Sequence, residues 1–173
     1  MSDPIHNPAH YTAYPVQPIE ITRYLGFCLG NVVKYALRAP YKGGAEDINK
    51  ALKYLEWEEE RPQALLTHAA YLAAFEKLEQ LSDFLHGRPS TPWEEIVTEA
   101  QADFLDTLVE YLEHGSRRYI GESLRPWLVR LAEAIDVDHC RVCGCTDDHA
   151  CEGGCSWVEE DLCSACVGQE GQL

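Results

Sequence analysis

The stretch GNVVKYALRAPYKGGAEDINKALKY, residues 30–54, predicts two helices joined by a tight turn. A helical pattern of apolar residues covers residues 27–38, and Pro40 stops it because proline cannot donate the next helical hydrogen bond. A lysine and two glycines at residues 42–44 form the turn. A second helical pattern then runs over residues 45–60, so this part of the chain is expected to be a pair of packed helices.

Helical patterns continue on both sides of this pair. A short helix is expected to open at Pro18, since proline suits the first turn of a helix. Downstream, apolar residues at three- and four-residue steps predict a helix over residues 63–85. The tetrapeptide TPWE at residues 91–94 is a capping box that begins a helix ending near His114. A last helix is expected over residues 124–135, and strand-like alternation is confined to the C-terminal tail, which predicts an all-α main domain.

The charge of the chain limits its partners. With 173 residues and a net charge of −15, the protein repels DNA backbones and anionic membranes, so we expect no duplex-DNA or membrane partner. No run of about 18 apolar residues exists and the N-terminal residues lack the features of a signal peptide, which predicts a cytoplasmic protein. Six of the fourteen basic residues gather near the helix pair, namely Arg23, Lys34, Arg38, Lys42, Lys50 and Lys53. An anionic ligand is therefore expected there.

The tail HCRVCGCTDDHACEGGCSWVEEDLCSAC, residues 139–166, holds seven of the eight cysteines. Its two C-x-x-C pairs predict a small zinc ribbon or knuckle in which a structural Zn²⁺ is bound by Cys140, Cys143, Cys163 and Cys166. Disulfide pairing is the alternative, which a chain without an export signal disfavours. Further possible ligands lie between the pairs, namely Cys145, His149, Cys151 and Cys155. They either form a second site or share in the first.

The helix pair presents polar side chains in register. In the first helix they recur at steps of three and four residues, at Asn31, Lys34, Tyr35 and Arg38, and the second helix repeats the arrangement with Asp47, Lys50 and either Lys53 or Tyr54. Gly43 in the connecting turn is expected to let backbone N–H groups approach a ligand, beside the partial positive charge of a helix N-terminus. These features predict binding of a multiply charged anion such as a nucleotide phosphate. The alternative is that both charged faces are solvated surface.

Three segments resemble a known family. They are NPAHY at residues 7–11, PIE at 18–20 and FCLGNVVKYALRAPYKGGAEDINKALKYL at 27–55. Together they resemble a small domain family of tailed phages that includes a nucleotide kinase, which phosphorylates nucleoside monophosphates without a Walker A loop. The match covers about the first third of the chain, and the cysteine tail is similar to short zinc modules appended to diverse phage proteins. The resemblance implies a phage-type nucleotide-binding protein, with nucleoside-monophosphate kinase as the expected activity, acting in the host cytoplasm.

The resemblance also implies positions for the site. The candidate substrate-binding or catalytic residues are His10, Tyr11, Asn31, Lys34, Tyr35, Arg38, Lys42, Asp47, Lys50 and Tyr54. For phosphoryl transfer, Asp47 would hold Mg²⁺ or accept a proton, while Lys34 and Arg38 would supply positive charge. The sequence G-x-x-x-x-G-K-[ST] does not occur, which excludes the ordinary P-loop.

Four segments are expected from these patterns. Residues 1–62 form the nucleotide-kinase-like domain, residues 63–138 a helical extension packed on it, residues 139–168 the zinc module and residues 169–173 a tail. Because the N-terminal arm is rich in aromatic residues and the core is narrow, we also expect a homo-oligomer.

Two other functions fit parts of the sequence. A non-catalytic protein that sequesters a nucleotide, for instance a signalling nucleotide of a host defence pathway, would use the same cationic residues. A Mg²⁺-dependent nucleotide pyrophosphohydrolase would use an acidic stripe on the fourth long helix, formed by Glu95, Glu99, Asp103, Asp106, Glu110 and Glu113. A solvated helix face is the simpler interpretation of that stripe.

Overall fold

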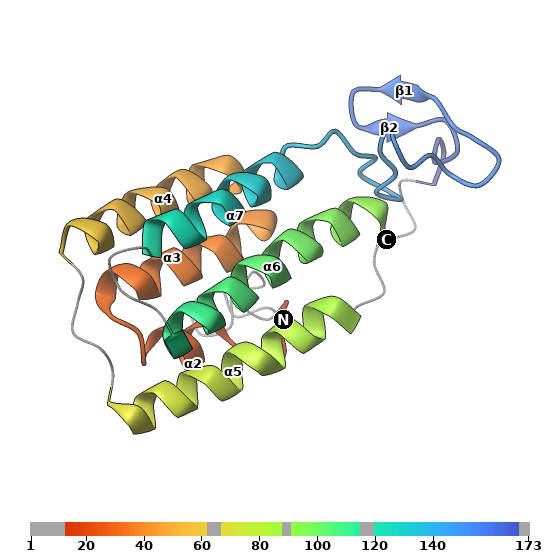
Figure 1. The fold of residues 1–173 in the computed structure, drawn as a ribbon. Coiled ribbons are helices and arrows are strands. Elements are labelled where there is room, and N and C mark those ends of the chain that lie inside the picture. Colours follow the sequence, from red (N-terminus) through yellow and green to blue (C-terminus); the bar gives the residue numbers. More distant parts are fainter. Residues whose placement is uncertain (1–12, 62–66, 88–90, 115–119, 170–173) are drawn as a thin grey trace, which may run out of the picture.

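The computed structural model describes residues 13–61, 67–87, 91–114 and 120–169 (Figure 1). The helices in these ranges are α2 (Pro18–Thr22), α3 (Phe27–Arg38), the 3-10 helix η1 (Ala39–Tyr41), α4 (Gly44–Glu60), α5 (His68–Gly87), α6 (Pro92–His114) and α7 (Ile120–Ile135). Two short strands follow, β1 (Trp157–Glu159) and β2 (Leu162–Cys163). The main body is therefore mostly helical, as the sequence predicts, and the strands lie in the cysteine tail.

The helices pack side by side as a closed bundle. Helix α6 contacts α5 on one side and α7 on the other, α7 contacts α4, and α4 contacts α3. Helix α2 contacts both α3 and α5, which closes the arrangement. Gly30 permits the close packing of α2 on α3, because a Cβ there would lie 3.2 Å from the carbonyl oxygen of Thr22. The five long helices run roughly lengthwise through the body (Figure 1).

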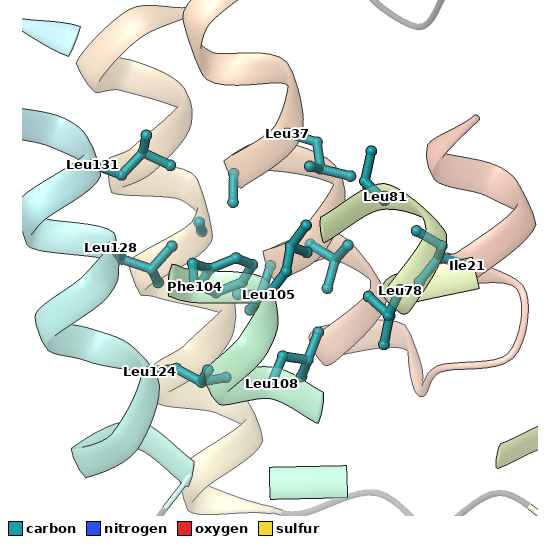
Figure 2. Packing of buried hydrophobic residues seen from close by; sticks show 14 of the residues in the cluster. Ile21, Leu37, Leu78, Leu81, Phe104, Leu105, Leu108, Leu124, Leu128 and Leu131 are labelled. Carbon is teal, nitrogen blue, oxygen red and sulfur yellow. The ribbon is translucent and has the colours of Figure 1, made fainter. Parts of the chain in front are cut away.

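One continuous apolar cluster fills the bundle (Figure 2). Its largest fully buried side chains include Ile21, Leu37, Leu78, Leu81, Phe104, Leu105, Leu108, Leu124 and Leu128. Phe104 of α6 lies among leucines from the neighbouring helices (Figure 2). Burial of such side chains stabilises the fold by about 1.5 to 3 kcal/mol each. The division of the body at residue 62 stays a prediction.

A polar contact also lies inside the body. The Tyr14 hydroxyl donates a hydrogen bond of 2.7 Å to the carbonyl oxygen of Leu37, at the end of α3. The Gln101 amide of α6 donates to the Tyr14 oxygen over 2.9 Å and to the carbonyl oxygen of Ala36 over 3.2 Å. Both side chains are buried, so these bonds satisfy carbonyl groups that the end of α3 leaves open. They attach the segment before α2 to the middle of the bundle.

The helix boundaries confirm some local signals and correct others. The capping box is present, since the Thr91 backbone N–H donates to Glu94 over 3.0 Å and the Glu94 N–H donates back to Thr91 Oγ1 over 3.3 Å. Helix α7, however, begins at Ile120 rather than near residue 124, and it contains Pro126. Ile120 is fully buried, which favours the additional helical turn despite the proline.

The cysteine tail lies at the end of the bundle where α6 begins (Figure 1). Its two strands pair antiparallel, with Trp157 opposite Cys163. The backbone N–H of Trp93, in the first turn of α6, donates to the carbonyl oxygen of Gly144 over 3.1 Å. The Trp93 ring stacks on His139 with centroids 4.1 Å apart. The tail thus contacts the N-terminal turn of α6 through both backbone and rings.

Gly144 is required at this contact. Its φ of 68° lies in the left-handed region, and a Cβ at this position would lie 2.3 Å from Thr91 Oγ1. Only glycine therefore allows the tail to approach the capping residue of α6 so closely.

No helix within the described ranges combines the length and the apolar character needed to cross a membrane.

Candidate functional site

Three basic side chains gather around the ring of Tyr35. The Lys34 ammonium lies 4.1 Å from the ring centroid, the Arg38 guanidinium carbon 4.9 Å and the Lys50 ammonium 5.8 Å. Lys34 and Arg38 come from α3 and Lys50 from α4. Cations are attracted to the negative face of an aromatic ring, which explains why three like charges tolerate this proximity. We call Lys34, Arg38 and Lys50 the cationic face; it includes three of the positions expected from the sequence.

A buried ion pair lies beneath the cationic face. Asp47 is fully buried, and Arg38 donates to both of its oxygen atoms over 2.7 Å each. Lys50 also donates to Asp47 Oδ1 over 3.2 Å and contacts the exposed Glu46 over 2.6 Å. The hydrogen bond from Arg38 lowers the pKa of the Asp47 carboxyl, against the opposing effect of burial. Both carboxylate oxygens of Asp47 are thus already hydrogen-bonded within the protein.

Gly43 in the turn leaves room for the Asp47 carboxylate. A Cβ on Gly43 would lie 2.1 Å from Asp47 Cγ, so the missing side chain leaves the room that the carboxylate occupies. The sequence predicts that Gly43 admits a ligand to the helix N-terminus. The structure places the Asp47 carboxylate in that space, because the fourth residue of α4 folds back against the turn.

The remaining expected residues differ in position. Asn31 donates to the carbonyl oxygen of Phe27 over 2.7 Å and accepts a hydrogen bond of 2.5 Å from Lys34, so it holds the Lys34 ammonium in place. Lys42 is exposed in the turn after η1. His10 and Tyr11 lie outside the described residues.

An aromatic row continues from the cationic face, and sequence reasoning missed half of it. The Tyr35 ring stacks on Tyr54 at 5.9 Å between centroids, and Tyr54 contacts Phe27 at 5.7 Å and Trp57 at 5.2 Å. Phe27 is 66% exposed and Trp57 is 44% exposed. We call Phe27, Tyr35, Tyr54 and Trp57 the aromatic row. The three-residue step from Tyr54 to Trp57 was the available signal, since such residues share a helix face.

The acidic stripe of α6 contacts neighbouring helices. Asp103 accepts a hydrogen bond of 2.7 Å from Arg130 of α7, and Glu99 lies 3.7 Å from the same guanidinium. Asp106 accepts a hydrogen bond of 2.6 Å from Ser82 of α5. Among the described residues, the groups with ligand atoms close enough to share a metal ion consist of cysteines. These carboxylates therefore take part in helix packing.

The tail brings its cysteines together. All seven are free thiols, and two groups of four have sulfur atoms within 4.8 Å of one another. The first group is Cys140, Cys143, Cys145 and Cys163, and the second is Cys145, Cys151, Cys155 and Cys163. The cluster can therefore hold a metal ion such as zinc. Cys166 is buried in the same cluster, whereas His149 is exposed.

The thiols of this cluster differ in acidity. Burial opposes ionisation of Cys140, but hydrogen bonds from the backbone of Cys143, Cys163 and Val142 outweigh it and lower the pKa of the Cys140 thiol to about 6. The pKa of Cys151 is raised to about 12, chiefly by its hydrogen bond with Cys143. The backbone N–H groups that donate to Cys140 stabilise its thiolate form, which is the form that binds metals.

One family model matches part of the chain. It is described as a protein of unknown function, DUF3310, and matches residues 5–56. No curated protein and no solved structure matches the chain. The matched segment includes α2, α3 and most of α4, and with them the cationic face; it ends one residue before Trp57. The cysteine tail lies outside the match.

Proposed function

We propose that the α3–α4 pair binds a nucleotide. The observation that carries this proposal is the continuity of the cationic face with the aromatic row, which share the ring of Tyr35. A nucleotide combines a planar base with a multiply charged phosphate group, so it needs both kinds of surface side by side. The resemblance of this segment to a family with a nucleotide kinase supports the same ligand.

The two parts of the surface have separate tasks. Lys34 and Lys50 are partly exposed and present ammonium groups to the phosphate. Phe27 and Trp57 present exposed rings on which a base stacks, an interaction worth about 1 to 3 kcal/mol per base in nucleic-acid complexes. Arg38 is 17% exposed and bonded to Asp47, so its main role is to join α3 to α4 beside Lys34 and Lys50.

Binding fits the site better than phosphoryl transfer does. Transfer needs a carboxylate that holds Mg²⁺ or accepts the proton of the attacking hydroxyl. Asp47 is buried and its oxygen atoms are bonded to Arg38 and Lys50. A ligand retained without turnover is accordingly the expected outcome.

Calorimetry with nucleosides and the matching nucleotides tests the proposal. Trp57→Ala should weaken binding of both by about tenfold, because it removes a stacking surface. Lys34→Ala should weaken binding of the nucleotide by a similar factor and leave the nucleoside unaffected, because it removes a charge that contacts phosphate. If both variants are folded and bind the nucleotide as the parent does, the face is solvated surface and the proposal is wrong.

Matched controls come from α5. Leu72 is 50% exposed there, and Leu72→Ala controls for loss of an exposed apolar side chain. Lys77→Ala controls for loss of a lysine, since Lys77 contacts Gln80 on the same helix. Neither should change nucleotide affinity beyond the small effect of a screened surface charge.

A second assay separates binding from turnover. The protein is incubated with Mg²⁺, ATP and labelled nucleoside monophosphates, and the products are resolved by chromatography. Recovery of unchanged, retained ligand supports the proposal. Formation of a nucleoside diphosphate at the expense of ATP would establish a kinase instead, and release of pyrophosphate from a triphosphate would establish a pyrophosphohydrolase.

A further inference from the structure

The sulfur atoms of the tail have the spacing of tetrahedral metal ligands. The Sγ atom of Cys163 lies 3.7 Å from that of Cys143 and 3.9 Å from that of Cys151, which belong to different groups and lie 3.6 Å from each other. Cys145 and Cys155 lie 3.7 Å apart. Since a Zn–S bond is about 2.3 Å long, two thiolates on one tetrahedral zinc ion lie about 3.8 Å apart. The cluster therefore has room for ions at zinc–thiolate distances.

The arrangement of the two groups exceeds what one ion needs. Each group contains four sulfur atoms, and both contain Cys145 and Cys163. Two tetrahedral ions require eight metal–sulfur bonds. Six cysteines supply eight bonds when two of them bind both ions. The two groups together contain six of the seven cysteines of the tail and share two, which is the composition of such a centre; Cys166 belongs to neither group.

A single ion leaves half of this arrangement unexplained. One ion bound by Cys140, Cys143, Cys145 and Cys163 gives no reason for Cys151 and Cys155 to approach the same sulfur atoms. Both shared residues are buried, with Cys145 3% exposed and Cys163 1% exposed, and Cys140 is buried to a similar degree. Bridging thiolates lie between two ions, so a central and buried position is the one they require.

We propose that the tail holds two divalent ions of the zinc type, bridged by the thiolates of Cys145 and Cys163. Cys140 and Cys143 complete the shell of one ion, and Cys151 and Cys155 complete the shell of the other. The six thiols release six protons on binding, and six thiolates with two divalent ions leave two negative charges in excess. Backbone N–H groups offset part of this charge, since Cys163 donates to Cys140 Sγ over 3.4 Å and Cys151 donates to Cys155 Sγ over 3.3 Å.

Metal counting on the full chain tests the proposal. Native mass spectrometry of protein purified under reducing conditions and saturated with zinc should show two ions per chain. After replacement of zinc by ¹¹³Cd, NMR should show two cadmium resonances, each split by the other through the shared thiolates. A single ion at saturation would overturn the proposal, as would two resonances without mutual splitting or an iron–sulfur chromophore in the isolated protein.

Variants identify the bridging residues. Cys145→Ser should lower the zinc stoichiometry below two, because it removes a ligand from both ions. Cys28→Ala is the matched control, since Cys28 is a buried free cysteine of α3 and should leave two ions bound. If Cys145→Ser still binds two ions whose cadmium resonances split each other as in the parent, Cys145 is not a bridge. The result with the parent protein stands even if this variant fails to fold.

Discussion

The helical body and the cysteine tail bury different chemistry. The body buries aliphatic and aromatic side chains from six helices in one cluster. In the tail, the buried apolar cluster consists of Cys140, Cys145, Leu162, Cys163 and Cys166, so sulfur takes the place of hydrocarbon. A segment this short cannot bury enough apolar surface to offset the entropy of folding. The chain thus uses two sources of stability, apolar burial in the body and the cysteine cluster in the tail. Truncation of the core should affect mainly the body, and removal of metal mainly the tail.

Metal removal should have the largest effect, and it should be concentrated in the tail and the first turn of α6. Structural zinc contributes about 10 to 16 kcal/mol to the folding of small zinc modules. Chelation under reducing conditions should therefore unfold residues 139–166 while the helices persist. Hydrogen exchange measures the loss of amide protection in the tail, and far-ultraviolet circular dichroism measures the helices. Retained protection in the tail would show that it folds without metal.

Truncation of the core should produce the converse result. Phe104 is fully buried on α6, and Phe104→Ala removes a large side chain and leaves a cavity. The free energy of unfolding of the body should fall by about 3 to 5 kcal/mol. Urea denaturation followed by circular dichroism measures it. Zinc content should be unchanged in the folded variant, and a parallel loss of zinc would show that the two regions fold as one unit.

Lowering the pH should reduce the stability of the helical body, because Asp47 becomes protonated. The folded-state pKa of this carboxyl lies below its usual value of 3.8, chiefly because Arg38 donates hydrogen bonds to it. Its contribution is therefore fully present above about pH 4 and is lost as the pH falls through the folded-state pKa. Asp47→Asn should cost about 1.5 to 3 kcal/mol at neutral pH, the usual value of a charged hydrogen bond.

Unfolding free energies of the parent and of Asp47→Asn, measured between pH 7 and pH 2, check this prediction. The difference between the two proteins should shrink below pH 4. A difference that stays constant over this range would mean that the charge of Asp47 contributes nothing to stability.

The smallest effect is expected where body and tail meet. Thr91→Ala removes the side-chain cap of α6 and should cost about 1 kcal/mol. Thr107→Ala is a suitable control, because the Thr107 hydroxyl bonds to the Asp103 carbonyl within the same helix. That variant should be neutral, since alanine has the higher helix propensity. Thermal denaturation of both variants measures the difference, and equal melting temperatures would contradict a capping role.

Local signals in the sequence predicted the parts of the fold that depend on neighbouring residues. The capping box at Thr91 and Glu94 and the turn after Pro40 involve residues a few positions apart, and the structure contains both. The start of α7 was predicted too late, because burial of Ile120 depends on helices far away in the sequence.

The candidate site was predictable in its composition but less so in its geometry. Helical spacing placed Lys34, Tyr35 and Arg38 on one face, and the structure brings them together with Lys50. Burial of Asp47 and exposure of Phe27 depend on how α3 packs against α4, which spacing alone does not reveal. In the same way, the C-x-x-C pairs predict a metal site, whereas the sharing of Cys145 between two groups depends on the folded tail.

The bond between the Trp93 N–H and the Gly144 carbonyl oxygen has a consequence for how the two regions communicate. Gly144 lies between Cys143 and Cys145, so the proposed metal ligands hold the carbonyl group that caps the first turn of α6. Thermodynamic linkage requires such a coupling to be reciprocal. Metal binding in the tail should therefore stabilise the start of α6, and any ligand that stabilises α6 should raise the metal affinity of the tail by the same factor.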